Sequence, residues 1–95
     1  MTLQEIIKSS PTDQYSAIYL YIGDNCVWDY KEGIESILLI SQEPCIESEK
    51  VSLQELIHYA KELDYPEDIL TLECEYERTE LKEAIWSTNK VSFSF

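Results

Sequence analysis

The stretch from Leu70 to Glu77 alternates between two kinds of side chain without a break. Its even positions carry Leu70, Leu72, Cys74 and Tyr76, and its odd positions carry Thr71, Glu73, Glu75 and Glu77. Successive side chains of a β-strand point to opposite faces of a sheet, so this period of two predicts a half-buried strand. The chain is therefore expected to build a sheet with an apolar face that other elements cover.

Three segments are predicted as helices. In Ser52–Leu63, Ser52 and Glu55 form a capping box, and an apolar stripe follows it: Leu53, Leu56, Ile57, Ala60 and Leu63. Thr2–Ser9 begins with the same kind of capping box, formed by Thr2 and Glu5. Thr79–Thr88 is predicted as a third helix, whose inward residues are Leu81, Ala84 and Ile85.

The remaining apolar segments are predicted as strands. Tyr15–Ile22 alternates, the Gly23-Asp24-Asn25 turn follows it, and Cys26–Tyr30 returns as the second strand of a hairpin. The periodicity of Glu35–Ser41 fits a strand or a helix, but its shortness and the nearby Pro44 favour a central strand. Val91–Phe95 is expected to end the chain as a short strand.

These elements predict an α+β fold in one domain covering residues 1–95, in the order α-β-β-β-α-β-α-β. The expected sheet is mostly antiparallel or mixed, with about four or five strands and two or three helices packed on it. The chain has 95 residues, of which 44% are hydrophobic. That composition is sufficient for one core without disulfides or metals.

Acidic residues dominate the charge of the chain. Nineteen Asp and Glu residues oppose seven Lys and Arg residues, which gives a formal net charge of −12. Such a field repels phosphates and anionic lipid surfaces, so neither direct nucleic-acid binding nor membrane binding is expected. It attracts a cationic protein and speeds its capture, while the simpler alternative is that the charge only keeps the protein soluble.

The cysteines and the N-terminal sequence predict a cytoplasmic protein. Cys26, Cys45 and Cys74 are widely spaced and form no CxxC pair, so they are expected to be free, structural thiols. Residues 1–5 contain no basic segment leading into an apolar one, so no signal peptide is expected. The longest aliphatic run, Ile37–Ile40, is far shorter than the roughly 20 residues of a membrane span.

Few residues are suited to catalysis or to cofactor binding. The single histidine, His58, lies about 140° round the predicted helix from Leu53 and is expected to face solvent. Two glycines cannot form a phosphate-binding loop, and no calcium-loop pattern occurs. We therefore expect no catalytic residues, no cofactor and no metal, and we expect that the protein is not an enzyme.

Two groups of residues are candidates for partner binding. The first is an acidic strip on one strand face and its surroundings: Glu67, Asp68, Glu73, Glu75, Glu77 and Glu80. Its simpler interpretation is a solvated outer face of an edge strand. The second group is aromatic, with Tyr19 and Tyr21 beside Tyr15 on one strand face and Trp86 opposite the apolar stripe of the third helix. The tyrosine row is either part of the core or, where it is open, a binding surface.

The leading functional hypothesis is an acidic inhibitor. In its general character, being small, acidic, poor in glycine and aromatic, the chain is similar to the immunity proteins that neutralise bacterial toxins, although no motif carries this likeness. Such a protein would occlude the active site of a basic toxin or nuclease. The alternatives are a small structural or adaptor subunit of a larger complex and a nucleic-acid mimic directed against host defence.

Overall fold

The computed structural model describes residues 1–63, 65–66, 68–76 and 78–95. Its elements in chain order are α1 (Leu3–Ser9), the 3-10 helix η1 (Tyr15–Ala17), β1 (Tyr19–Ile22), β2 (Asn25–Glu32), β3 (Ser36–Gln42), the 3-10 helix η2 (Glu47–Glu49), α2 (Leu53–Ala60), β4 (Thr71–Cys74), β5 (Thr79–Glu80), β6 (Glu83–Ser87) and β7 (Lys90–Ser94). The protein is mostly β-structure.

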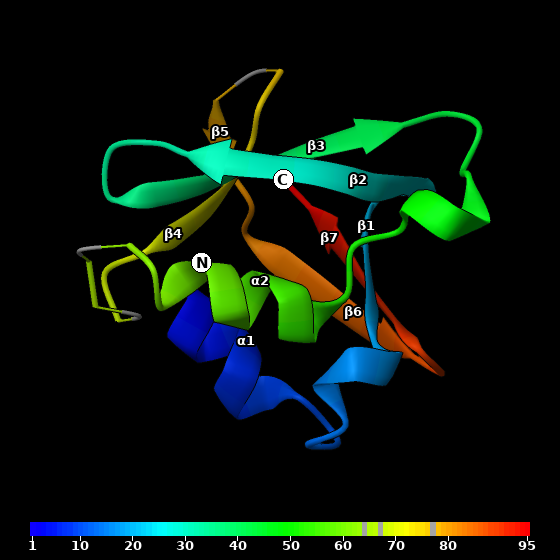
Figure 1. Ribbon diagram of the computed structural model, residues 1–95, viewed down its shortest axis with the longest axis horizontal. Coiled ribbons are helices and arrows are strands. Elements are labelled where there is room, and N and C mark those ends of the chain that lie inside the picture. Colours follow the sequence, from blue (N-terminus) through cyan, green and yellow to red (C-terminus); the bar gives the residue numbers. More distant parts are fainter. Residues whose placement is uncertain (64, 67, 77) are drawn as a thin grey trace.

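Within the described residues, the strands form one mixed sheet of seven strands in the order β5-β4-β3-β2-β1-β7-β6. The β1–β7 and β3–β4 pairs are parallel, and the other neighbouring strands are antiparallel. The sheet curls into a half-barrel, with α1 and α2 against one face (Figure 1). The predicted fold class was therefore wrong: the sheet has more than four or five strands, and two α-helices are present in the described ranges.

The difference arises chiefly at Thr79–Thr88, where the third helix was predicted. These residues form β5 and β6, and Asn89 takes a left-handed conformation (φ 61°) in the turn that leads to β7. The side chain of Ile85 is 64% exposed, whereas Trp86 packs against the core. In a short segment the spacing of a few apolar residues fits both the period of a helix and the period of a strand. Here the backbone pairing with β7 stabilises the strand.

The predicted strand from Tyr15 to Ile22 was also too long. Residues Tyr15–Ala17 form η1, and the strand begins at Tyr19. The backbone N–H groups of Ala17 and Ile18 donate to the carbonyl groups of Gln14 and Tyr15, at 3.0 and 3.3 Å. These local hydrogen bonds satisfy the backbone groups that the predicted strand would have paired with a neighbour. By contrast, all of the predicted segment Glu35–Ser41 except Glu35 lies in β3, and its prediction as a central strand is confirmed.

One hydrophobic cluster lies between the sheet and the two helices. It includes Leu3 and Ile6 of α1, Leu53 and Leu56 of α2, and inward residues of the sheet such as Phe93. The predicted capping box of α1 is confirmed, because both reciprocal contacts between Thr2 and Glu5 are present. At α2, Ser52 Oγ accepts the expected hydrogen bond from the backbone N–H of Glu55, at 3.1 Å.

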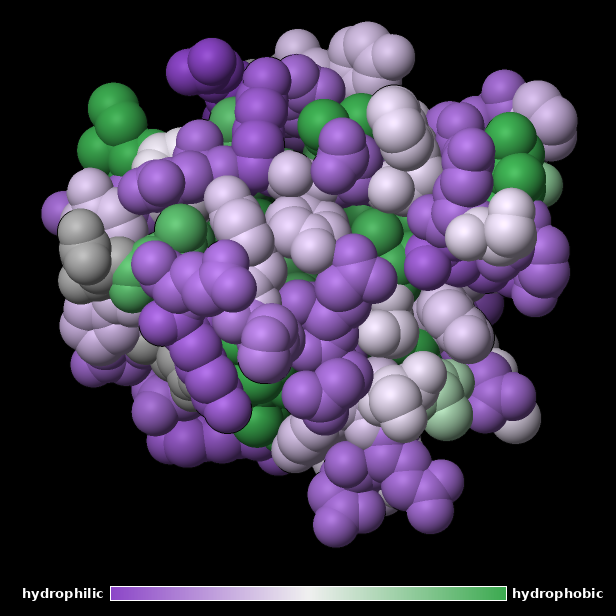
Figure 2. All heavy atoms as spheres, in the orientation of Figure 1, coloured by the Kyte–Doolittle hydropathy of each residue, from purple (hydrophilic) through white to green (hydrophobic). Residues whose placement is uncertain are grey.

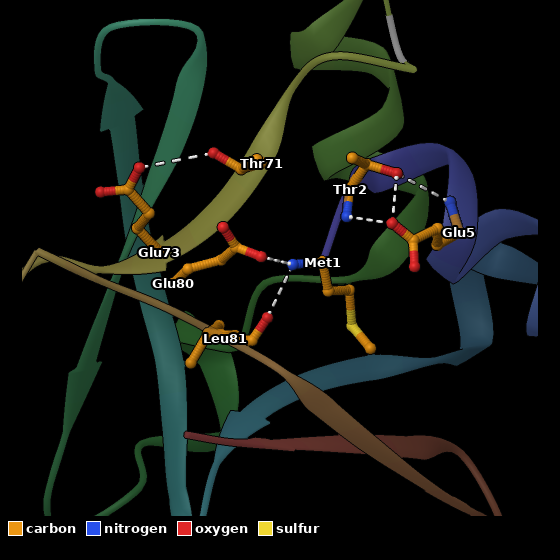
Figure 3. A network of polar contacts seen from close by, with 7 residues as sticks. All are labelled: Met1, Thr2, Glu5, Thr71, Glu73, Glu80 and Leu81. Carbon is orange, nitrogen blue, oxygen red and sulfur yellow. Dashed lines mark hydrogen bonds and ion pairs between the residues drawn. The ribbon is translucent and has the colours of Figure 1, made fainter.

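Met1 connects β4 to the chain after β5. Its backbone carbonyl accepts a hydrogen bond from the N–H of Leu72, and its amino group donates to the carbonyl of Leu81, both at 2.9 Å. The same amino group makes an ion pair with Glu80 (Figure 3). The N-terminal residue is therefore held between β4 and the segment that begins at Glu80.

Candidate protein-binding surface

Two members of the predicted acidic strip, Glu75 and Glu80, make ion pairs within the chain. Glu73 and Glu80 lie opposite each other in the β4–β5 pair, and Glu80 is bound by the Met1 amino group. This amino group lowers the pKa of the Glu80 carboxyl by its hydrogen bond and its charge. Glu75 makes an ion pair with Lys31, with a distance of 2.6 Å between Lys31 Nζ and Glu75 Oε1. These partners weaken the field that the strip presents to another molecule.

The strand that carries the strip is also shorter than predicted. β4 ends at Cys74, and Glu75 lies in the turn that follows it. Asp68 is exposed in the segment before β4. Glu67 and Glu77 lie outside the described residues. The described residues therefore do not form a regular row of carboxylates on one strand face.

Tyr19 and Tyr21 lie on the face of β1 opposite the core, because Leu20 and Ile22 are the residues that point inward. Lysine side chains cover their rings. Lys90 Nζ lies 4.4 Å from the Tyr21 ring centroid, and Lys50 Nζ lies 5.4 Å from the same centroid and 5.9 Å from that of Tyr19. These cation–π contacts leave the two rings poorly suited to a second cation.

Trp86 lines a hollow of about 440 Å³ between the β6–β7 hairpin and the segment from Pro11 to Ile18. Its position on the inner side of β6 reverses the prediction, in which Ile85 faced inward and Trp86 outward. The other lining residues are Pro11, Thr12, Gln14, Ala17, Ile18, Ser87, Thr88 and Asn89. This hollow offers apolar surface with a neutral polar rim, and it has no charge that would select a cationic group.

A different pair of tyrosines lies where β2 passes α2. The ring centroids of Tyr30 in β2 and Tyr59 in α2 are 4.7 Å apart, with the planes tilted by 55°. The Tyr30 hydroxyl donates to Glu55 Oε2 at 2.9 Å. Glu55 and Tyr59 are four residues apart on α2 and so share one side of the helix. The contact therefore holds two half-buried rings and a carboxylate together at the edge of the core.

Acidic residues surround this tyrosine pair. Burial raises the pKa of Tyr30 to about 12, and the hydrogen bond to Glu55 and the charges of Glu55 and Asp29 add to the effect. Burial also raises the pKa of Tyr59, with contributions from the charges of Glu32, Glu62 and Asp29 and an opposing backbone hydrogen bond from Glu32. We call this group the tyrosine–acid surface, and its members are Asp29, Tyr30, Glu32, Glu55, Tyr59 and Glu62.

The tyrosine–acid surface keeps a net negative charge. Within the described residues, the ion pairs of the protein involve Glu47, Glu75 and Glu80 and none of its four carboxylates. All four of these acidic residues are exposed. Hydrophilic residues predominate on the face that contains β2 and α2, with smaller hydrophobic patches between them (Figure 2). The arrangement combines aromatic rings with a rim of carboxylates, which suits Arg or Lys side chains of a partner.

The raised pKa of Tyr30 is directly testable. Because its pKa of about 12 in the folded protein exceeds the value of about 10 in the unfolded chain, its contribution to stability is complete below pH 10 and is lost as the pH rises towards 12. Tyrosinate absorbance of the wild type and of Tyr30→Phe gives the titration of Tyr30 by difference. We expect a midpoint near 12, which Glu55→Gln lowers, whereas a midpoint near 10 in the wild type contradicts the contact.

His58 is exposed on α2, as the sequence predicted. Replacing His58 with Gln should therefore change the free energy of unfolding by less than about 0.5 kcal/mol, as is usual at exposed positions. Urea unfolding at neutral pH measures this change, and a loss above about 1 kcal/mol would mean that His58 has a structural contact.

In the described part of the chain, no group of three or more His, Cys, Asp or Glu side chains could hold a metal ion.

Sequence patterns did not predict the tyrosine–acid surface. Glu55 was predicted at the start of a helix and Tyr30 at the end of a strand, and Tyr59 belonged to neither group of candidates. The only local signal is the spacing of Glu55 and Tyr59, which puts both on one side of α2. Glu55 and Tyr59 are 25 and 29 positions from Tyr30, and their contact with it depends on how β2 packs on α2.

Comparison of the chain with protein-family models, with curated proteins and with solved structures finds no match. Among the described helices, none is both long enough and apolar enough to cross a membrane.

Proposed function

We propose that the protein acts by binding, as an acidic inhibitor that captures a cationic protein partner through the tyrosine–acid surface. The observation that carries this proposal is the contact of Tyr30 with Tyr59 and Glu55, with further carboxylates around it. Tyrosine provides a large contact area at a low cost in side-chain entropy and is common among the residues that dominate binding energy.

Recognition is expected to proceed in two stages. First, the net charge of −12 attracts the partner and raises the rate of encounter. An Arg or Lys side chain of the partner then packs on the rings of Tyr30 and Tyr59 and pairs with a carboxylate of the rim. In this second stage the cation–π contact and the charge-assisted hydrogen bonds slow dissociation.

The partner class that fits best is a basic bacterial toxin or nuclease, with the present protein as its immunity protein in the cytoplasm. A nuclease active site carries positive charge for phosphate binding, and a carboxylate-rich surface is complementary to it. A nucleic-acid mimic directed against host defence would use the same complementarity. The adaptor alternative has less support, because exposed apolar side chains lie on separate segments: Ile34 in the loop after β2, Tyr76 in the turn after β4 and Ile85 in β6.

Affinity purification of the tagged chain from its native cells tests this proposal. A surface triple variant, Asp29→Asn, Glu32→Gln and Glu62→Gln, should recover much less of the partner than the wild type does. The matched control is a remote triple variant, Asp13→Asn, Asp24→Asn and Glu43→Gln, which removes the same charge from other exposed positions. The co-purified protein should be basic, and its activity should fall when the wild-type chain is added. An acidic partner, or equal recovery with the surface variant, contradicts the proposal.

A further inference from the structure

Two of the cysteines lie against each other on the sheet face opposite the helices. The backbone N–H of Cys26 in β2 donates to Cys45 Sγ at 3.1 Å. Cys26 is opposite Gln42 in the β2–β3 pair, and the chain returns to it three residues after Gln42. Cys26 is buried and Cys45 is exposed. One thiol of the pair is therefore accessible to a reagent, and the other is enclosed beside it.

We propose that Cys26 and Cys45 form a disulfide in the folded protein when it meets a disulfide oxidant such as oxidised glutathione. The exposed Cys45 thiolate attacks one sulfur of the oxidant, forms a mixed disulfide and releases one reduced glutathione. The Cys26 thiolate then attacks Cys45 Sγ and releases the second reduced glutathione. The two protein thiols are oxidised by two electrons, and their two protons end on the two released thiols.

The environments of the two thiols determine the order of these steps. Burial raises the pKa of the Cys26 thiol, and its interaction with the Cys45 thiol raises the pKa further. Cys26 therefore holds its proton at neutral pH and is a poor attacking group towards an oxidant in solvent. Cys45 reacts first, and closure by Cys26 should become faster as the pH rises above neutrality.

Cys74 is the natural control for this pair. It is a buried member of the hydrophobic cluster on β4, whereas Cys26 is not in that cluster. β3 separates β4 from β2 in the sheet. A reaction that occurs in the folded protein should therefore leave Cys74 reduced, whereas the unfolded chain can pair its three cysteines in any combination.

The disulfide should stabilise the protein, because it ties the segment after β3 to β2. It closes the loop from Cys26 to Cys45, which for a loop of this length corresponds to a rise in Tm of about 15 °C. That segment includes η2 and leads to Lys50, which covers Tyr19 and Tyr21. The disulfide would thus hold this segment on the sheet under oxidising conditions. Its formation does not depend on the proposed function.

The test is oxidation of the folded full-length chain by oxidised glutathione, followed by intact mass measurement, peptide mapping and thermal unfolding. Wild type and Cys74→Ser should each lose two hydrogens, yield the peptide joining Cys26 to Cys45 and gain about 15 °C in Tm. Cys45→Ser should form no intramolecular disulfide, and chain unfolded in urea should give mixed pairings. Three free thiols in the oxidised wild type, a lasting glutathione adduct on Cys45, a disulfide that includes Cys74 or an unchanged Tm would each overturn the proposal.

Discussion

Replacing Leu81 with Ala is expected to lower the free energy of unfolding by about 3 kcal/mol, the size typical of a leucine fully enclosed in a core. Leu81 is completely buried. Its backbone N–H donates to the carbonyl of Leu72 in β4, and the next residue, Lys82, donates to the carbonyl of Ser94 in β7, each at 2.9 Å. Leu81 therefore lies where the chain passes from one edge of the curled sheet to the other.

Ile85→Ala is the matched control for this measurement. The Ile85 side chain is 64% exposed on β6, so its loss should cost less than about 0.5 kcal/mol. In the helix that the sequence predicted, Leu81 and Ile85 share one buried face and would cost similar amounts. Urea unfolding of the two variants distinguishes the structures, and equal destabilisation would contradict the strand assignment of β6.

The second large effect is expected in the rate of partner association. The surface triple variant should associate with its co-purified partner about tenfold more slowly than the wild type at low salt, because its charges lie at the contact. The remote triple variant should slow association much less, although it has the same net charge. Stopped-flow measurements at low and physiological salt give both rates.

Salt should reduce the difference between the variants, since charges at a contact are screened over about 8 Å at physiological ionic strength. Folding should be little affected in either triple variant, because the replaced residues are exposed and lie in no ion pair among the described residues. If the remote variant slows association as much as the surface variant does, the net charge acts without a preferred surface.

Sequence patterns correctly predicted the elements that depend on interactions between residues close together in the chain. The alternation around Leu72 and the capping box of Thr2 depend on neighbouring residues, and both correspond to elements of the structure. β5 and β6 depend instead on backbone pairing with other strands: β5 pairs with β4, which precedes it, and β6 pairs with β7, which follows it. The spacing of Leu81 and Ile85 carries no information on that pairing, so a helix was predicted.

The same distinction applies to the binding surface. Composition predicted the sign of the charge, because acidic residues outnumber basic ones along the chain. It could not predict that Lys31, from β2, pairs with Glu75, or that the Met1 amino group pairs with Glu80. These contacts between distant segments weaken the predicted strip. The contact of Tyr30 with Tyr59 and Glu55 is equally non-local, so the tyrosine–acid surface could be found only in the folded structure.

Oxidative footprinting of tyrosine side chains, with and without the co-purified partner, measures whether the partner covers the tyrosine–acid surface. In the free protein Tyr30 and Tyr59 are half-buried, so we expect them to react at their exposed edges, and Tyr76 is 81% exposed. We predict that the partner protects Tyr30 and Tyr59, while Tyr76 keeps its reactivity as the internal control. Unchanged reactivity of Tyr30 and Tyr59 in a complex that forms at full occupancy would show that the partner binds elsewhere.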